Sequence, residues 1–217
     1  MLAEQKSNYP EITIIRILAV ILVVFIQHSF GPYGQSWHFA TAPTITLNIY
    51  GIICSTFNNF SMPLLMFISA YLYSSLHFEQ NKYQKYKDLI INKFKRLLLP
   101  AYIFGILFML TLGNHNWMNI FNGYNHLWYL PALFWCFVIS PWIIKINNLK
   151  IQLLILAFGF IFIYLPLPGY FGLGSFHIYF FYFYIGILLA KYKTEFYNFF
   201  QKKTNKIFLI SIVLLSC

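Results

Sequence analysis

The run of residues 11–30, EITIIRILAVILVVFIQHSF, is the feature that most limits how this chain can fold. As an α-helix it would extend about 30 Å, which matches the hydrocarbon thickness of a lipid bilayer. Arg16 lies near its start and His28 lies close to its end. Ionisable side chains are costly within a membrane, so both are candidate functional residues, although either could also be an ordinary interfacial anchor. The run predicts a first transmembrane helix.

The composition excludes a soluble globular protein. Hydrophobic residues make up 59% of the chain, charged residues only 9%, and the mean hydropathy is +0.64. Soluble domains carry about 25% charged residues. The net charge of +10 would suggest a nucleic-acid partner in a soluble protein. The sequence has no nucleic-acid-binding motif, however, and we expect no nucleic acid to bind. The chain is therefore predicted to be a polytopic membrane protein in contact with lipid.

Further apolar runs predict the rest of an all-α helical bundle with about seven spans. Residues 31–56 form an uncharged connection, part of which could begin the next helix. The predicted spans are residues 57–76, 97–112, 127–144, 151–166 and 175–190, with a seventh beginning at 207–217. We expect residues 1–217 to form one transmembrane domain that is incomplete at its C-terminus, because SIVLLSC ends within an apolar run.

The basic residues are distributed as a membrane topology would distribute them. Fourteen of the fifteen lie in the N-terminus and in loops 77–96, 145–150 and 191–206, and the fifteenth is Arg16. The loops predicted on the opposite side have none. Cytoplasmic loops are rich in Lys and Arg, so this pattern predicts a cytoplasmic N-terminus. It places His28 near the outer face and Lys93 and Arg96 at the inner face.

Four stretches in order resemble the membrane-bound acyltransferase 3 family over about residues 11–140. They are RILAVILVVFIQH, MPLLMFISAYLYSS, KFKRLLLPAY and NHLWYLPALF. Similar proteins are bacterial inner-membrane enzymes of about ten spans. The resemblance implies transfer of an acyl group, commonly acetyl, from cytoplasmic acyl-CoA to a hydroxyl of a surface polysaccharide or its lipid-linked precursor. It implies acyl-CoA as a donor substrate and no permanently bound cofactor.

The first span departs from the family pattern by one residue. The family usually places ten residues between its Arg and its His, whereas eleven separate Arg16 from His28. By strict spacing Gln27 occupies the family's His position. A π-bulge or a kink would restore His28 to that position, and such insertions recur at functional sites. We assign the catalytic role to His28 and keep Gln27 as the alternative.

The chemistry of acyl transfer suggests a role for each candidate. A histidine titrates in a range that suits a general base, which an alcohol nucleophile needs at neutral pH, so His28 could activate the acceptor hydroxyl or, alternatively, carry the acyl group itself. Arg16 lies about 18 Å of helix away, too far to stabilise the oxyanion, so the resemblance implies that it orients the donor or maintains a polar path. Lys93 and Arg96, one turn apart, are candidate ligands for the phosphates of the donor. They could equally be positive-inside anchors.

The start of the fourth span supplies a candidate acceptor site. His126 and Trp128 lie there on the predicted outer side, where a sugar would approach. Aromatic faces stack on sugar rings, but Trp and Tyr also form the interfacial belt of membrane proteins. In the second span, Ser69 and Ala70 favour close helix packing because small residues let helices approach. We find no metal-ligand spacing, and the cysteines have no redox pattern.

These observations predict a bacterial inner-membrane O-acyltransferase whose partners are acyl-CoA and a surface glycan or lipid-linked sugar. The alternative is a non-enzymatic transporter or flippase component of polysaccharide export, in which Arg16 and His28 would line a conduit. Both alternatives place polar groups within a helix bundle, so they share the predicted topology. Dependence on acyl-CoA separates them.

Overall fold

The computed structural model describes residues 14, 17, 21, 44–112, 117–123, 125–165 and 170–199 of the chain. Every regular element in these residues is helical, which confirms the predicted all-α class. Within the first predicted span, Ile14, Ile17 and Ile21 are helical and exposed. Arg16, Gln27 and His28 lie outside the described residues, as do residues 207–217.

Helix α2 is longer than the sequence predicts. It spans Thr44–Gln80, 37 residues, and continues through Pro63, whereas the prediction was residues 57–76. Pro43 directly precedes it, which is a favourable place for proline because the first amides of a helix have no partner within it. No charged residue interrupts the run from Thr44 to Leu76, so part of the predicted connection is helical.

The next helix also begins earlier than predicted. α3 (Tyr86–Lys93), a π-helical turn η3 (Phe94–Leu98) and α4 (Leu99–Leu112) follow one another without a break. The prediction placed residues 77–96 in a loop. In the structure the connection is a short turn in which Asn81 and Tyr83 adopt positive φ angles, and it ends before Tyr86. Lys and Arg have good helix propensity, so the basic residues extend the helix instead of stopping it.

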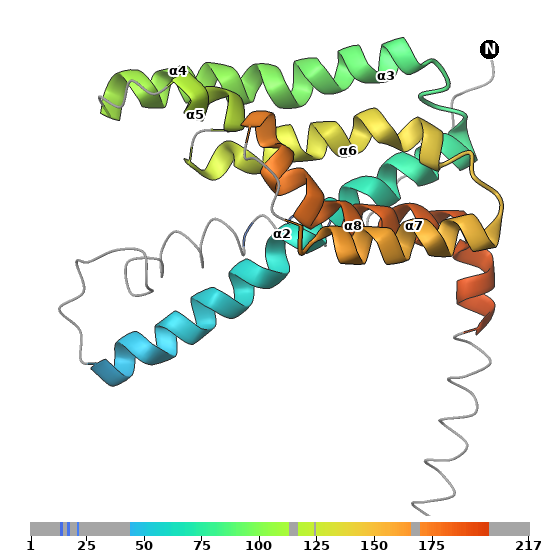
Figure 1. The fold of residues 1–217 in the computed structure, drawn as a ribbon, viewed down its shortest axis with the longest axis horizontal. Helices are drawn as coiled ribbons and strands as arrows, with labels where there is room; N and C mark the ends of the chain where they lie inside the picture. Colours follow the sequence, from blue (N-terminus) through green and yellow to red (C-terminus); the bar gives the residue numbers. More distant parts are fainter. Residues whose placement is uncertain are drawn as a thin grey trace, which may run out of the picture.

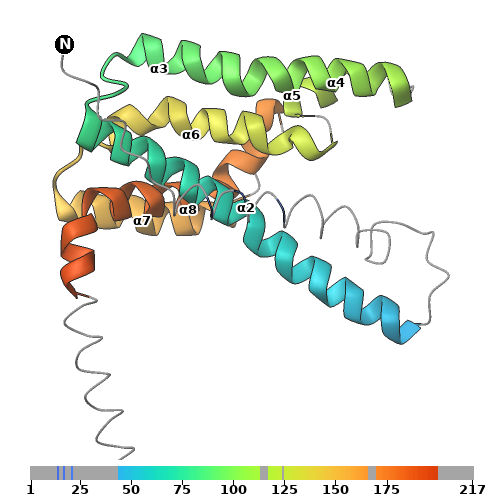
Figure 2. The same cartoon turned by 180° about the vertical axis from the view of Figure 1, so that it is seen from behind.

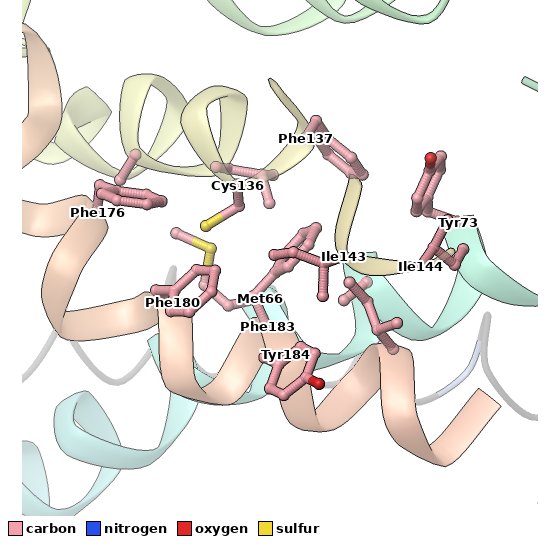
Figure 3. Close-up of a cluster of buried hydrophobic side chains, with 14 of the residues drawn as sticks. Met66, Tyr73, Cys136, Phe137, Ile143, Ile144, Phe176, Phe180, Phe183 and Tyr184 are labelled. Carbon is pink, nitrogen blue, oxygen red and sulfur yellow. The ribbon is translucent and has the colours of Figure 1, made fainter. Parts of the chain in front are cut away.

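Three further helices complete the bundle: α6 (Tyr129–Ile143), α7 (Leu149–Phe162) and α8 (Leu173–Lys191). Figures 1 and 2 show three layers, with α3 and α4 on one side, α6 in the middle, and α2, α7 and α8 on the other side. The core lies where α2, α6 and α8 meet and is built around Met66, Cys136, Phe180 and Phe183 (Figure 3).

Three basic turns gather at one end of the bundle. Lys193 pairs with Glu79, with 3.3 Å between Nζ and Oε1. Lys191 Nζ donates to the carbonyl of Ile146 and, at 2.8 Å, to Asn147 Oδ1. We call residues 77–87, 144–150 and 191–195 the basic end. α2, α6 and α8 run toward it, whereas α3, α4 and α7 run away from it (Figure 1).

The opposite end is made of short aromatic segments: α5 (Trp117–Asn122) and the 3₁₀ turns η4 (Asn125–Trp128) and η5 (Tyr170–Gly172). Trp135 Nε1 donates to the carbonyl of Phe171 at 2.8 Å. We call this the aromatic end.

The helices are apolar enough for a membrane. Among the described residues, Tyr86–Thr111 and Tyr170–Lys191 are long and apolar enough to cross a bilayer. Tyr129–Ile143 and Leu149–Phe162 are shorter apolar helices.

Candidate functional site

Lys93, the last residue of α3, turns toward the middle layer of the bundle. Its Nζ atom lies 3.6 Å from the centroid of the Phe137 ring on α6 and 5.5 Å from that of Tyr83. The side chain is half-buried. An ammonium group at these distances is attracted by the negative face of an aromatic ring, which helps to hold it away from bulk water.

Arg96 is placed differently from Lys93. It lies in the π-helical turn η3 and is exposed, as is Lys95. The prediction that Lys93 and Arg96 share one helix face assumed α-helical spacing between them. A π-helical turn takes more residues to complete, so it rotates Arg96 away from the position that an α-helix would give it. One predicted cation therefore faces the bundle and the other faces outward.

Tyr73 of α2 completes an aromatic enclosure around this amine. Its ring contacts Phe137 edge-on at 5.5 Å between centroids and Tyr83 at 5.7 Å. Only 2% of Tyr73 is exposed, and its hydroxyl has no hydrogen-bond partner among the described residues. We call Tyr73, Tyr83, Lys93 and Phe137 the Lys93 enclosure. Of these four residues, the sequence drew attention only to Lys93.

The Ser140 hydroxyl lies close to the Tyr73 hydroxyl but does not form a hydrogen bond with it. Ser140 Oγ donates to the carbonyl of Phe137 at 2.8 Å and makes no well-aligned hydrogen bond to the Tyr73 oxygen. His77, whose ring lies 6.2 Å from that of Tyr73, has its Nδ1 atom 3.2 Å from the carbonyl of Lys82. The Ser140 hydroxyl and the His77 Nδ1 atom are thus both within hydrogen-bond distance of backbone carbonyls.

Trp128 lies at the aromatic end, directly before α6. Its ring centroid is 5.2 Å from that of Tyr179 on α8, and it packs on Met62 and Leu65 of α2. The side chain remains half-buried. One face of the indole is thus covered by the protein, and Tyr179 is a neighbour that the sequence did not reveal. His126 lies in η4, and its side chain is outside the described part of the chain.

The two candidate sites are connected through α6. Trp128 immediately precedes this helix, and Phe137 lies on it about 13 Å further along. The predicted acceptor side and the predicted donor side are therefore at different depths of one bundle. The predicted catalytic pair, Arg16 and His28, lies outside the described residues, so its roles stay predictions. No group of three or more potential metal ligands occurs in the described ranges.

Comparison with known proteins identifies the family. The sequence profile of the acyltransferase 3 family, described as an acyltransferase domain, matches residues 9–217. No curated protein and no solved structure matches the chain. The match extends well beyond the four resembling stretches and covers every described helix. The chain therefore belongs to the acyltransferase 3 family, a polytopic membrane family, and is a multi-pass membrane acyltransferase.

Proposed function

We propose that this protein transfers an acyl group, acetyl by preference, from cytoplasmic acyl-CoA to a hydroxyl of an extracytoplasmic polysaccharide or its lipid-linked precursor. The observation that carries the proposal is the family match over residues 9–217. The gathering of the basic turns at one end supports a cytoplasmic basic end, because positively charged loops are retained on that side of bacterial membranes. The donor then enters at the basic end and the acceptor at the aromatic end.

The donor is a polyanion, and the two cations of the KFKR stretch suit successive contacts with it. Arg96 is exposed and can meet the incoming phosphates with its planar guanidinium group. Lys93 lies deeper, over Phe137, where the surroundings are less polar and a charge interaction is stronger. We propose that Arg96 attracts the donor and that Lys93 holds it.

The reaction itself is assigned to residues of the first predicted span. His28 takes the proton of the acceptor hydroxyl while its oxygen attacks the thioester carbonyl. The tetrahedral intermediate collapses, the carbon–sulfur bond breaks, and the coenzyme A thiolate leaves and takes up the proton that His28 accepted. The products are the ester and free coenzyme A. Arg16 orients the donor within the bundle.

The aromatic end is the proposed acceptor site. Trp128 presents a rigid aromatic surface backed by Tyr179, and such surfaces stack on sugar rings. His126 lies in the same short turn and is proposed to bind the acceptor.

Transfer of labelled acetyl from acetyl-CoA by the purified protein in lipid nanodiscs tests the proposal. We expect labelled ester on a bacterial polysaccharide or lipid-linked sugar, and we expect His28→Ala to remove it while the protein remains in the membrane. His38→Ala, which changes another histidine of the predicted outer side, is the matched control and should retain transfer. Failure of the unmodified protein to bind coenzyme A or to acylate any glycan would refute the proposal. Polymer export that does not depend on acyl-CoA would favour a transporter.

A further inference from the structure

The buried hydroxyl of Tyr73 is one of the polar groups that the packing of the described helices leaves without a hydrogen-bond partner. The residue is 2% exposed, yet its oxygen has no hydrogen-bond partner among the described residues. Most buried polar atoms in folded proteins are paired, and an unpaired one costs about 1–3 kcal/mol. A phenylalanine would fill the same space without this cost. A bound ligand that accepts a hydrogen bond from this hydroxyl would explain why a tyrosine is present at this position.

The position of Tyr73 indicates where such a group would lie. Its ring contacts Phe137, and Lys93 Nζ lies over the ring of that same Phe137. Tyr83 contacts both the Tyr73 ring and the Lys93 amine. In Figure 3 the Tyr73 ring lies at the edge of the hydrophobic cluster, beside Phe137, with its hydroxyl pointing out of the cluster. The Tyr73 ring and the Lys93 amine thus share two aromatic neighbours, Phe137 and Tyr83.

We infer that Tyr73 is a donor-binding residue and that its hydroxyl and the Lys93 ammonium hold the same phosphate group of the acyl-CoA. The inference rests on the proposed function and deepens it by adding a second, uncharged contact. Both groups can donate hydrogen bonds, so a ligand that contacts both must accept several hydrogen bonds. The oxygen atoms of a phosphate group do so. Hydrogen bonds to an ionised acceptor are about twice as strong as neutral ones, which offsets the cost of keeping the hydroxyl buried.

Two serines of the same helix are suitable controls. Ser74 and Ser75 are also buried, and their hydroxyls also lack partners in the described part of the chain. Successive helical residues point about 100° apart, so neither follows the Tyr73 side chain toward Phe137. Tyr184 offers a second control, because its buried hydroxyl donates to the carbonyl of Gln152.

The test measures binding of coenzyme A and of pantetheine, which has no phosphate, to the purified protein in lipid nanodiscs. We expect Tyr73→Phe to weaken coenzyme A binding about tenfold, the effect of one hydrogen bond to a charged group. Lys93→Gln should weaken it at least as much. The loss in the double variant should be smaller than the sum of the two single losses, because two donors that share one phosphate are not independent. Ser74→Ala and Tyr184→Phe should leave coenzyme A affinity unchanged, and pantetheine should bind all variants equally.

Three results would overturn the inference. The first is unchanged coenzyme A affinity in Tyr73→Phe, the second is additive losses in the double variant, and the third is an equal loss for pantetheine. Thermal unfolding without ligand separates binding from folding, since Tyr73→Phe should melt at the same or a higher temperature than the unmodified protein. Failure of the unmodified protein to bind coenzyme A at all would instead refute the proposed function, and the two failures are distinguishable.

Discussion

Gly186 of α8 packs against Ala70 of α2 so closely that no side chain fits between the two helices. A Cβ atom built on Gly186 would lie 2.9 Å from the Ala70 Cβ, closer than carbon atoms approach in folded proteins. Ala70 is fully buried. The sequence predicts close packing at Ser69 and Ala70, and the structure confirms it for Ala70 and identifies Gly186 as its partner. The absence of a side chain at Gly186 thus lets α2 and α8 approach closely at this point.

Replacing Gly186 by leucine should therefore destabilise the bundle. The new side chain must force α2 and α8 apart, and overpacking of this kind costs about 1–3 kcal/mol or more. We expect a lower melting temperature and less protein recovered from the membrane. Gly159→Ala is the matched control, because a Cβ there would meet the Phe180 ring at 3.4 Å, an ordinary contact. Equal melting temperatures for Gly186→Leu and the unmodified protein would contradict this packing.

Lys191 should contribute more to stability than its neighbour Lys193. Its amine donates to Ile146 O and Asn147 Oδ1, and thereby satisfies acceptors of the turn between α6 and α7. Lys191→Met leaves these acceptors without their donor, so we expect a loss of about 1–3 kcal/mol in the free energy of unfolding. Lys193 forms an ion pair in which both side chains are nearly half exposed, and Lys193→Met should cost about 0–1 kcal/mol. Denaturant unfolding of the two variants in detergent gives the comparison.

Lys93 and Arg96 should differ in how salt affects their contributions to donor binding. Arg96 is exposed, so added salt screens its attraction for the donor, whereas half-buried Lys93 is screened less. We expect both Lys93→Gln and Arg96→Gln to raise the KM for acetyl-CoA at low salt. In high salt the defect of Arg96→Gln should largely disappear and that of Lys93→Gln should persist. Lys95→Gln serves as the control, and an identical salt response of all three variants would argue that they act only through net charge.

Trp128 should affect the acceptor and not the donor. Its ring lies on Tyr179 at the aromatic end, about 13 Å along α6 from Phe137 and the Lys93 enclosure. We expect Trp128→Ala to raise the KM for the sugar acceptor several-fold and to leave the KM for acetyl-CoA unchanged. Trp128→Phe keeps an aromatic surface and should retain most of the acceptor affinity. A change in the KM for acetyl-CoA alone would contradict the assignment of the acceptor to this end.

The parts of the fold that sequence predicts are those imposed by the membrane. Bilayer thickness and the distribution of Lys and Arg act on the whole chain, so the helical class and the gathering of the basic turns were predictable. The start of α3 was not, because no residue near Tyr86 marks the boundary strongly, and the start of α2 was missed although Pro43 directly precedes it. The Lys93 enclosure was not predictable either. Phe137 lies far from Tyr73, Tyr83 and Lys93 in the sequence, and only tertiary packing brings its ring to the amine.

The exposed face of the first predicted span makes the choice between His28 and Gln27 testable. Ile14, Ile17 and Ile21 are exposed and share one side of a helix, as residues three and four apart do. Counting at 100° per residue along an uninterrupted helix puts position 28 on that side and position 27 on the side of position 16. An inserted π-turn between positions 21 and 28 would turn position 28 to the side of position 16 and move position 27 about 80° away from it. Arg16, Gln27 and His28 lie outside the described residues, so their placement on the helix is a prediction from periodicity.

Activity measurements decide between the two. With the inserted turn, His28→Ala should lower kcat by about two to four orders of magnitude, the usual contribution of a general base, and Gln27→Ala should have little effect. A Gln27→His, His28→Gln exchange should then remain inactive, because it moves the imidazole away from the acceptor. Recovery of activity in the exchanged protein would show that position 27 faces the reacting groups and that the helix is uninterrupted. The exchange keeps composition and charge constant, so position alone accounts for the result.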